Sequence, residues 1–309
     1  MAKYANLLFD DSFKVVICAP GNERLLMDII ELLVPGKKLK SLELRDKEQH
    51  GLSISDKISN FDLYCTSETG EQFIVEMQNT AQRHYADRML CYASHPIRNQ
   101  LAKKLAERQE KIRQGLPPMM PMDYSLLPVY VVSILNFSIP HVTEDMLEEG
   151  LVSRYAIRNE HGEELMTDSL HFVYLELGRL KAKKSNPELC KTLLSRFAYS
   201  LKYMHELDAR PEAYNDDLIE RLFNASEFAN WNTEKQFEYE TIMRTELDRI
   251  AEMTYALEEA EARVQAKADA QKKAEILQIS KSLLANGVSV DVVVACTGLS
   301  KEEVTAQKE

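Results

Sequence analysis

The chain has 309 residues, of which 45% are hydrophobic and 28% are charged, and this composition is typical of a folded globular protein. The length exceeds what one ordinary core requires, so we expect one catalytic domain with helical additions. No stretch approaches the roughly 18 apolar residues of a membrane span, and the first residues lack a signal-peptide pattern, so the sequence predicts a cytoplasmic protein without membrane association. The formal net charge of −11 argues against adhesion of the whole surface to nucleic acid.

The cysteines are scattered along the chain without any C-x-x-C pair. This spacing predicts reduced thiols rather than a disulfide framework or a zinc site. The five positions are Cys18, Cys65, Cys91, Cys190 and Cys296.

The N-terminal part is predicted to form one helix followed by a meander of three strands. Apolar residues recur at helical spacing over Asn22–Leu33, and the pattern stops at Pro35-Gly36. Three strands are then expected, over Leu39–Leu44, Ile58–Thr66 and Gln72–Gln78.

A long helix is expected over Tyr85–Arg113, because the segment is rich in good helix formers and is stopped by Gly115. From Arg83 to Gly115 there are eight basic and three acidic residues, so the local net charge is +5 while the chain is acidic. A charged helix face of this kind is often simply solvated. Its place directly after a strand with an acidic residue also suits contact with a phosphate backbone.

The next segments extend the predicted sheet. The β-branched run Leu126–Phe137 is typical of a buried central strand. A hairpin is expected over Val152–Arg158 and His171–Leu177. After Pro187 the pattern is helical almost to the end of the chain.

The C-terminal part carries a heptad that changes from apolar to polar within one long helix, Phe237–Ala285. A short coiled coil, a helix packed on the body of the protein and a charged spacer helix all fit this pattern. Small helices should follow, with Ser300 and Glu303 forming a capping box. The heptad positions are Met243, Leu247, Ile250, Thr254, Leu257, Glu261, Val264 and Ala268.

Alternation along two neighbouring strands separates their apolar side chains from their polar ones. Successive side chains of a strand point to opposite faces. In the strand that ends at Gln78 we therefore expect Glu76 and Gln78 on one face. In the preceding strand Asp62 and Tyr64 share a face. We expect each strand to bury its apolar set and to expose its carboxylate.

The connection between these strands decides whether the two carboxylates meet. If residues 68–70 form a three-residue loop with Gly70 in the left-handed conformation, Ser67 pairs with Glu71. Asp62 then stands opposite Glu76, with β-carbons about 4.5–5.5 Å apart. A two-residue loop would shift the register by one residue and place the carboxylates on different faces.

Two opposed carboxylates need a neutralising partner, because like charges across a sheet are destabilising. A shared proton, a Lys or Arg side chain, or a divalent cation would each serve. Carboxylate oxygens suit Mg²⁺ or Mn²⁺, which also bind substrate phosphates.

Three segments of the chain resemble a known nuclease family. SFKVVI near the start, SNFDLYCTSETGEQFIVEMQ and the following YADRMLCYAS are similar to the Rpn family of recombination-promoting nucleases, which belongs to the PD-(D/E)XK superfamily. The resemblance covers about Ser12 to Leu180. It implies an α/β (α+β) fold, with a restriction-endonuclease-like mixed sheet flanked by helices and followed by a mainly helical C-terminal region.

The resemblance and the helical patterns together predict four parts of the chain. These are a nuclease-like domain (1–185), a helical extension (186–236), a long helix that could form a coiled coil (237–285) and a small helical tail (286–309).

The resemblance also implies a site. Asp62 would be the first metal ligand, Glu76 the second, and Gln78 would stand where the motif usually has Lys; all three would be catalytic, with Mg²⁺ or Mn²⁺. Phe61 replaces the nominal Pro of the motif. A helix-borne acid often completes such sites, and the candidates are Glu23, Asp28 and Glu31. Lys57 is a candidate for the missing positive charge, although the same sequence also fits a solvated lysine at a strand edge.

The function implied is a metal-dependent DNA endonuclease linked to recombination or mobile elements. The cation would activate a water for in-line attack on the scissile phosphate, and the basic helix would hold backbone phosphates without reading sequence. The alternative is a nuclease fold whose site has decayed and which acts as a DNA-binding or self-associating protein. In either case the C-terminal helices could form a homo-oligomer.

Overall fold

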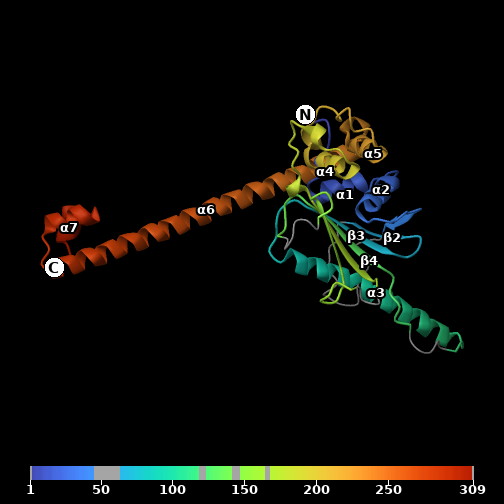
Figure 1. Cartoon of the computed structure of the whole chain (residues 1–309), viewed down its shortest axis with the longest axis horizontal. Coiled ribbons are helices and arrows are strands. Elements are labelled where there is room, and N and C mark those ends of the chain that lie inside the picture. Colours follow the sequence, from blue (N-terminus) through green and yellow to red (C-terminus); the bar gives the residue numbers. More distant parts are fainter. Residues whose placement is uncertain (1, 45–62, 118–122, 141–146, 164–167, 308–309) are drawn as a thin grey trace. The chain divides into compact units, whose positions relative to one another are not determined.

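The computed structural model of the chain describes residues 2–44, 63–117, 123–140, 147–163 and 168–307. The chain divides into two compact units, Met1–Met243 and Arg244–Glu309. The first unit contains a mixed sheet covered by helices on both faces (Figure 1). No helix in the described part of the chain is long and apolar enough to cross a membrane.

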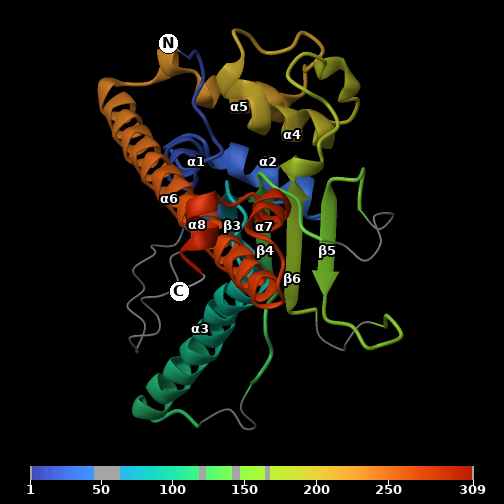
Figure 2. The same cartoon turned by 90° about the vertical axis from the view of Figure 1, so that its left-hand side faces the viewer.

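The sheet has six strands in the order β1-β2-β3-β4-β6-β5. Figure 2 shows β3, β4, β6 and β5 side by side in this order. The strands are β1 (Leu42–Leu44), β2 (Leu63–Ser67), β3 (Gln72–Gln78), β4 (Val129–Leu135), β5 (Val152–Ala156) and β6 (Leu170–Glu176). The pairs β1–β2, β2–β3 and β5–β6 are antiparallel, whereas β3–β4 and β4–β6 are parallel. Parallel neighbours need a crossover connection, and helix α3 (Tyr85–Arg113) lies in the connection between β3 and β4.

The two faces of the sheet bury two different cores. On one face Phe73, Val75 and Met77 pack with helices α1 (Asp10–Ile17), α2 (Glu23–Leu33), α4 (Leu193–Tyr203) and α5 (Asp217–Ser226). On the other face Ile74 and Val131 pack with the first half of α3. Figure 1 shows α3 on the side of the sheet opposite to α1, α2, α4 and α5. All seven residues of β4 are buried, as expected for a central strand with both faces covered.

The expected fold class and most of the expected elements are confirmed. The strand Gln72–Gln78 and the helix Tyr85–Arg113 have the bounds that the sequence indicated. The strand expected over Ile58–Thr66 is β2, which runs from Leu63 to Ser67; residues 58–62 lie outside the described residues. Within the described ranges, four short 3₁₀ helices were not expected: Leu177–Arg179, Pro187–Leu189, Met204–Glu206 and Phe228–Asn230.

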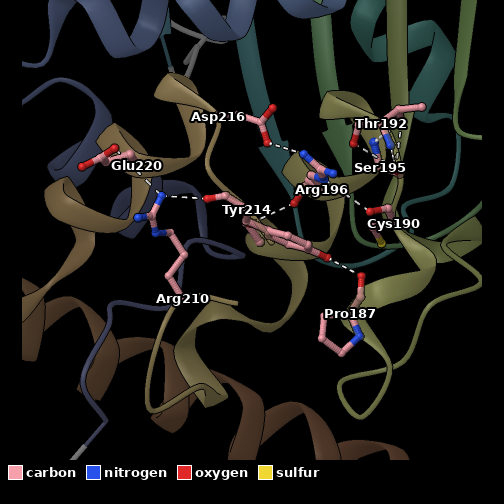
Figure 3. Close-up of polar contacts among 10 residues, drawn as sticks. Pro187, Cys190, Thr192, Ser195, Arg196, Arg210, Tyr214, Asp216 and Glu220 are labelled. Atoms are coloured by element: carbon pink, nitrogen blue, oxygen red, sulfur yellow. Dashed lines mark hydrogen bonds and ion pairs between the residues drawn. The ribbon is translucent and has the colours of Figure 1, made fainter. Parts of the chain in front are cut away.

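Polar contacts around Tyr214 hold the helical segments that follow the sheet (Figure 3). The Tyr214 hydroxyl donates to the Pro187 carbonyl (2.8 Å), and the Arg196 guanidinium lies over the Tyr214 ring. Arg196 also donates to Asp216 just before α5 (3.0 Å), and Arg210 donates to the Tyr214 carbonyl (2.7 Å). These contacts join α4, α5 and the loop between them.

The second unit contains the C-terminal part of α6 (Thr233–Ala285), α7 (Val290–Thr297) and α8 (Lys301–Thr305). Val293, Leu299 and Val304 form its small core, against which the apolar side chains at the end of α6 pack. Ser300 and Glu303 form the expected capping box of α8. The expected coiled coil of α6 stays a prediction.

Candidate active site

The β2–β3 hairpin has the connection on which the predicted site depends. The Ser67 amide donates to the Glu71 carbonyl (2.9 Å), so residues 68–70 form a three-residue loop. Gly70 closes it in the left-handed conformation with φ of 85°. Tyr64 stands opposite Ile74, as predicted.

The described register ends one residue short of the predicted carboxylate pair. Leu63 stands opposite Val75. Asp62, the first predicted metal ligand, lies outside the described residues, as does Lys57. The pairing of Asp62 with Glu76 therefore stays a prediction, supported by the register of the residues that follow it.

Glu76 and Gln78 lie in β3, on the face that packs against α3. The apolar alternation along β3 has the predicted phase, because Phe73, Val75 and Met77 belong to the core on the opposite face. The expectation that β3 exposes its carboxylate is wrong, since Glu76 is only 2% exposed. Sequence alternation gave the correct face of the strand, but not the helix that covers that face.

Arg88 of α3 is the residue that reasoning from the sequence missed. Its Nη2 lies 3.9 Å from Glu76 Oε2 and donates to Gln78 Oε1 at 2.5 Å. The guanidinium lies over the rings of Tyr85 and Tyr92, at 5.5 and 5.4 Å from their centroids. The sequence held a signal for this arrangement: spacings of three and four residues place Tyr85, Arg88 and Tyr92 on one face of a helix.

The polar groups next to Glu76 lie in a largely apolar environment. Ser133 of β4 stands beside Glu76 in the parallel register, and its hydroxyl contacts the Met89 sulfur. Burial raises the pKa of the Tyr85 hydroxyl, and the nearby negative charge of Glu76 raises it further. The site therefore combines one buried carboxylate with neutral polar groups and one guanidinium.

The acids of α2 are held by other groups on the opposite side of the sheet. Helix α2 packs on the core that contains Phe73, away from α3. Asp28 forms ion pairs with Arg24 and Arg221, each at 2.6 Å. Glu31 accepts from the Leu39 amide at 2.9 Å. These contacts give both acids a structural role and do not bring them to Glu76.

Glu23, the third helix-borne candidate, is an exposed residue in the first turn of α2. Its carboxylate accepts hydrogen bonds from its own amide and from the Gly21 amide, and these bonds lower its pKa. Glu23 therefore binds backbone amides at the N-terminal end of α2.

The position of α3 is fixed by contacts with the segment that precedes β4. The Gln100 side chain donates to the Leu127 carbonyl (3.0 Å) and accepts from the Leu127 amide (2.8 Å). Lys104 donates to Asp123 (2.8 Å), and this bond together with the Ser125 amide lowers the pKa of Asp123 to about 2. These anchors hold the helix that carries Arg88.

Beyond Gln100, α3 presents exposed basic side chains. Lys103, Lys111 and Arg113 are exposed, whereas Met89 and Tyr92 in the first half of the helix are buried. One helix thus covers the site with its first half and presents a basic surface with its second half. Exposed Lys and Arg side chains of this kind suit contacts with phosphates.

The residues at the site fit a hard divalent cation. No group of three or more His, Cys, Asp and Glu side chains in the described ranges could hold a metal ion. A Mg²⁺ site does not require such a group, because Mg²⁺ commonly binds through one or two carboxylates together with waters and substrate phosphates. Glu76 supplies one buried carboxylate, a ligand type that suits hard cations such as Mg²⁺ and Mn²⁺.

A sequence model of the PD-(D/E)XK nuclease family transposase matches residues 7–256 of the chain, which is well over half of its length. The match extends beyond the segments that carried the resemblance and includes β2, β3 and α3. The comparisons with curated proteins and with solved structures found no match.

Proposed function

The chain belongs to the PD-(D/E)XK nuclease family transposases, and from this premise we propose that it is a metal-dependent DNA endonuclease linked to recombination or mobile elements. One observation carries the proposal. Glu76 is buried beside Gln78 on β3, and the described hairpin register ends with Leu63 opposite Val75, from which we infer that Asp62 would stand opposite Glu76. A buried carboxylate needs positive charge beside it, and in this proposal a divalent cation adds to the charge that Arg88 supplies at 3.9 Å.

Asp62 and Glu76 are the residues that would hold Mg²⁺ or Mn²⁺ in this proposal. The cation would supply the positive charge that stabilises the scissile phosphate and lowers the pKa of the attacking water. Glu76 is well suited to this role because the packing of α3 on β3 fixes its position.

Gln78 has a different role from the Lys of the motif. Its amide is neutral, so it neither carries charge nor removes a proton. It donates a hydrogen bond to the attacking water or to a phosphate oxygen. The basic second half of α3 binds neighbouring phosphates, which positions DNA without reading its sequence.

Incubation of the purified chain with supercoiled plasmid in Mg²⁺ or Mn²⁺ tests this function. Nicked and linear products should form with either cation and should be absent in EDTA. If no product forms with any divalent cation while the protein is folded, the proposed activity is wrong.

A second function is favoured by one observation, the presence of Gln78 where the motif usually has Lys. Under this alternative the site has decayed and the protein binds DNA or associates with itself. Retained DNA binding without cleavage in Mg²⁺, Mn²⁺, Co²⁺ or Ca²⁺ would support this alternative over the nuclease.

We further propose that the chain forms a homo-oligomer through its C-terminal helices. The support is the exposed apolar row on α6, where Leu247, Leu257 and Val264 are 59%, 60% and 68% exposed. Residues 1–185 would then carry the nuclease, residues 186–236 would extend it, and residues 237–285 and 286–309 would serve assembly. The proposed site of action is the cytoplasm.

A further inference from the structure

Arg88 brings a guanidinium to both described residues of the candidate site. It reaches Glu76 at 3.9 Å and Gln78 at 2.5 Å from its place on the first turns of α3. The rings of Tyr85 and Tyr92 hold the guanidinium from the helix side. An arginine between two aromatic rings is partly desolvated, so its charge acts more strongly on its neighbours than an exposed charge does.

The contacts of Arg88 leave some of its hydrogen-bonding capacity unused. A guanidinium has five N–H donors; one group donates to Gln78 and another to Gln82. Arg88 Nε is buried and has no hydrogen-bond partner among the described residues. The 3.9 Å separation from Glu76 is longer than a hydrogen bond. Buried donors are normally paired, so Arg88 has capacity for a further acceptor oxygen, and a phosphate oxygen is an acceptor of this kind.

Arg88 also determines which end of the Gln78 amide is available. Arginine only donates hydrogen bonds, so the group of Gln78 that faces it must be the carbonyl oxygen, Oε1. The amide NH₂ of Gln78 is then oriented away from that bond. Gln78 is therefore presented as a hydrogen-bond donor rather than as an acceptor or a base.

We propose that Arg88 and Gln78 together replace the Lys of the nuclease motif, with Arg88 supplying the positive charge and Gln78 the directed hydrogen bond to the scissile phosphate of DNA. The inference rests on the proposed nuclease function and deepens it. The charge comes from α3 instead of from β3, and the neutral residue on β3 is its partner. The planar guanidinium suits a phosphate because it offers two parallel donors.

The proposal predicts a loss of rate rather than a loss of DNA binding. Removing one preorganised donor to a developing negative charge typically costs about 100- to 1,000-fold in rate. Arg88→Gln should therefore lower single-turnover cleavage at saturating DNA and metal by about 100-fold or more. The dissociation constant for DNA should change by less than about threefold, because the exposed basic side chains of α3 remain.

Placing the positive charge on β3 instead of α3 tests the proposed role of Arg88 directly. In the double variant Arg88→Gln/Gln78→Lys, Lys stands at the motif position, so cleavage should recover at least about tenfold relative to Arg88→Gln. Arg88→Lys, which keeps the charge on α3, should retain more activity than Arg88→Gln. A role limited to packing would give no such recovery when a lysine is placed on the strand.

Arg196→Gln is a matched control. Arg196 is also half-buried, lies over a tyrosine ring and pairs with a carboxylate, but it belongs to the contacts around Tyr214 (Figure 3). Its replacement should lower the melting temperature and leave the cleavage rate at 25 °C unchanged.

Three outcomes would overturn the inference, and they are distinguishable. If wild type cleaves and Arg88→Gln cleaves within threefold of it, Arg88 is not part of the site although the nuclease proposal stands. If Arg88→Gln is inactive and the double variant recovers nothing, Arg88 only stabilises the fold. If wild type itself does not cleave with any divalent cation, the proposed function fails and this inference fails with it.

Discussion

Replacing Gly70 by Ala should destabilise the hairpin that sets the register of the candidate site. Gly70 has φ of 85°, a conformation that costs an L-residue with a β-carbon about 1–2 kcal/mol. A β-carbon at this position would also lie 2.7 Å from Leu127 Cδ1. The contact can be relieved only by moving the Leu127 side chain, at a further cost of about 0.5–1.5 kcal/mol.

Gly36→Ala separates these two effects. Gly36 has φ of 78°, and nothing lies within 4 Å of a β-carbon built on it. Gly36→Ala should therefore cost about 1–2 kcal/mol through backbone strain alone. Gly70→Ala should cost about 1.5–3.5 kcal/mol, because it adds the crowding against Leu127.

Urea and thermal unfolding followed by circular dichroism compare both variants with wild type. In a unit of this size each kcal/mol corresponds to a shift of about 2–4 °C in melting temperature, so Gly70→Ala should melt about 3–14 °C below wild type. If Gly70→Ala is as stable as wild type, the turn does not hold the register. If Gly70→Ala loses as much unfolding free energy as Gly36→Ala, crowding against Leu127 does not contribute to the destabilisation.

Three other predictions test different parts of the structure. Glu176 is fully buried and accepts a hydrogen bond from Arg179 Nε at 2.7 Å. Arg179→Met should therefore lower the unfolding free energy by about 3–5 kcal/mol, and adding Glu176→Gln should recover part of this loss. Equal stability of wild type and Arg179→Met in urea would contradict the prediction. Burial lowers the pKa of His205 below its ordinary 6.5, so its neutral form stabilises the fold above about pH 6.5, and this stabilisation is lost as the pH falls through the lowered pKa. His205→Gln should therefore flatten the pH dependence of the unfolding free energy between about pH 7 and 5. The same pH dependence in wild type and variant would refute this prediction. If α6 mediates self-association, Leu247→Glu/Leu257→Glu should lower the mass measured by analytical ultracentrifugation to that of one chain, whereas an unchanged oligomer would place the interface elsewhere.

The sequence predicted those elements whose pattern reflects local geometry. The alternation in β3 and the helix formers of α3 gave both elements their correct bounds. The loop that closes with Gly70 was predictable because a three-residue hairpin loop requires a residue with positive φ. The register of Tyr64 with Ile74 then followed from counting.

Features that depend on tertiary packing were not predictable from these patterns. Helix α1 is only eight residues long, and it is stabilised by the packing of Phe13, Val16 and Ile17 rather than by a long periodic pattern. The burial of Glu76 depends on where α3 lies on the sheet. The position of the Arg88 side chain depends on the same packing. A count of charges along the helix does not distinguish Arg88 from the exposed basic residues.

Cleavage by the variants Asp62→Asn and Glu76→Gln tests the central claim most directly. Each change removes one carboxylate charge while keeping the size of the side chain. With supercoiled plasmid and saturating Mg²⁺ or Mn²⁺, wild type should produce nicked DNA, and each variant should lose this activity while still binding DNA. If wild type cleaves and both variants cleave at the same rate, the two carboxylates are not the catalytic site.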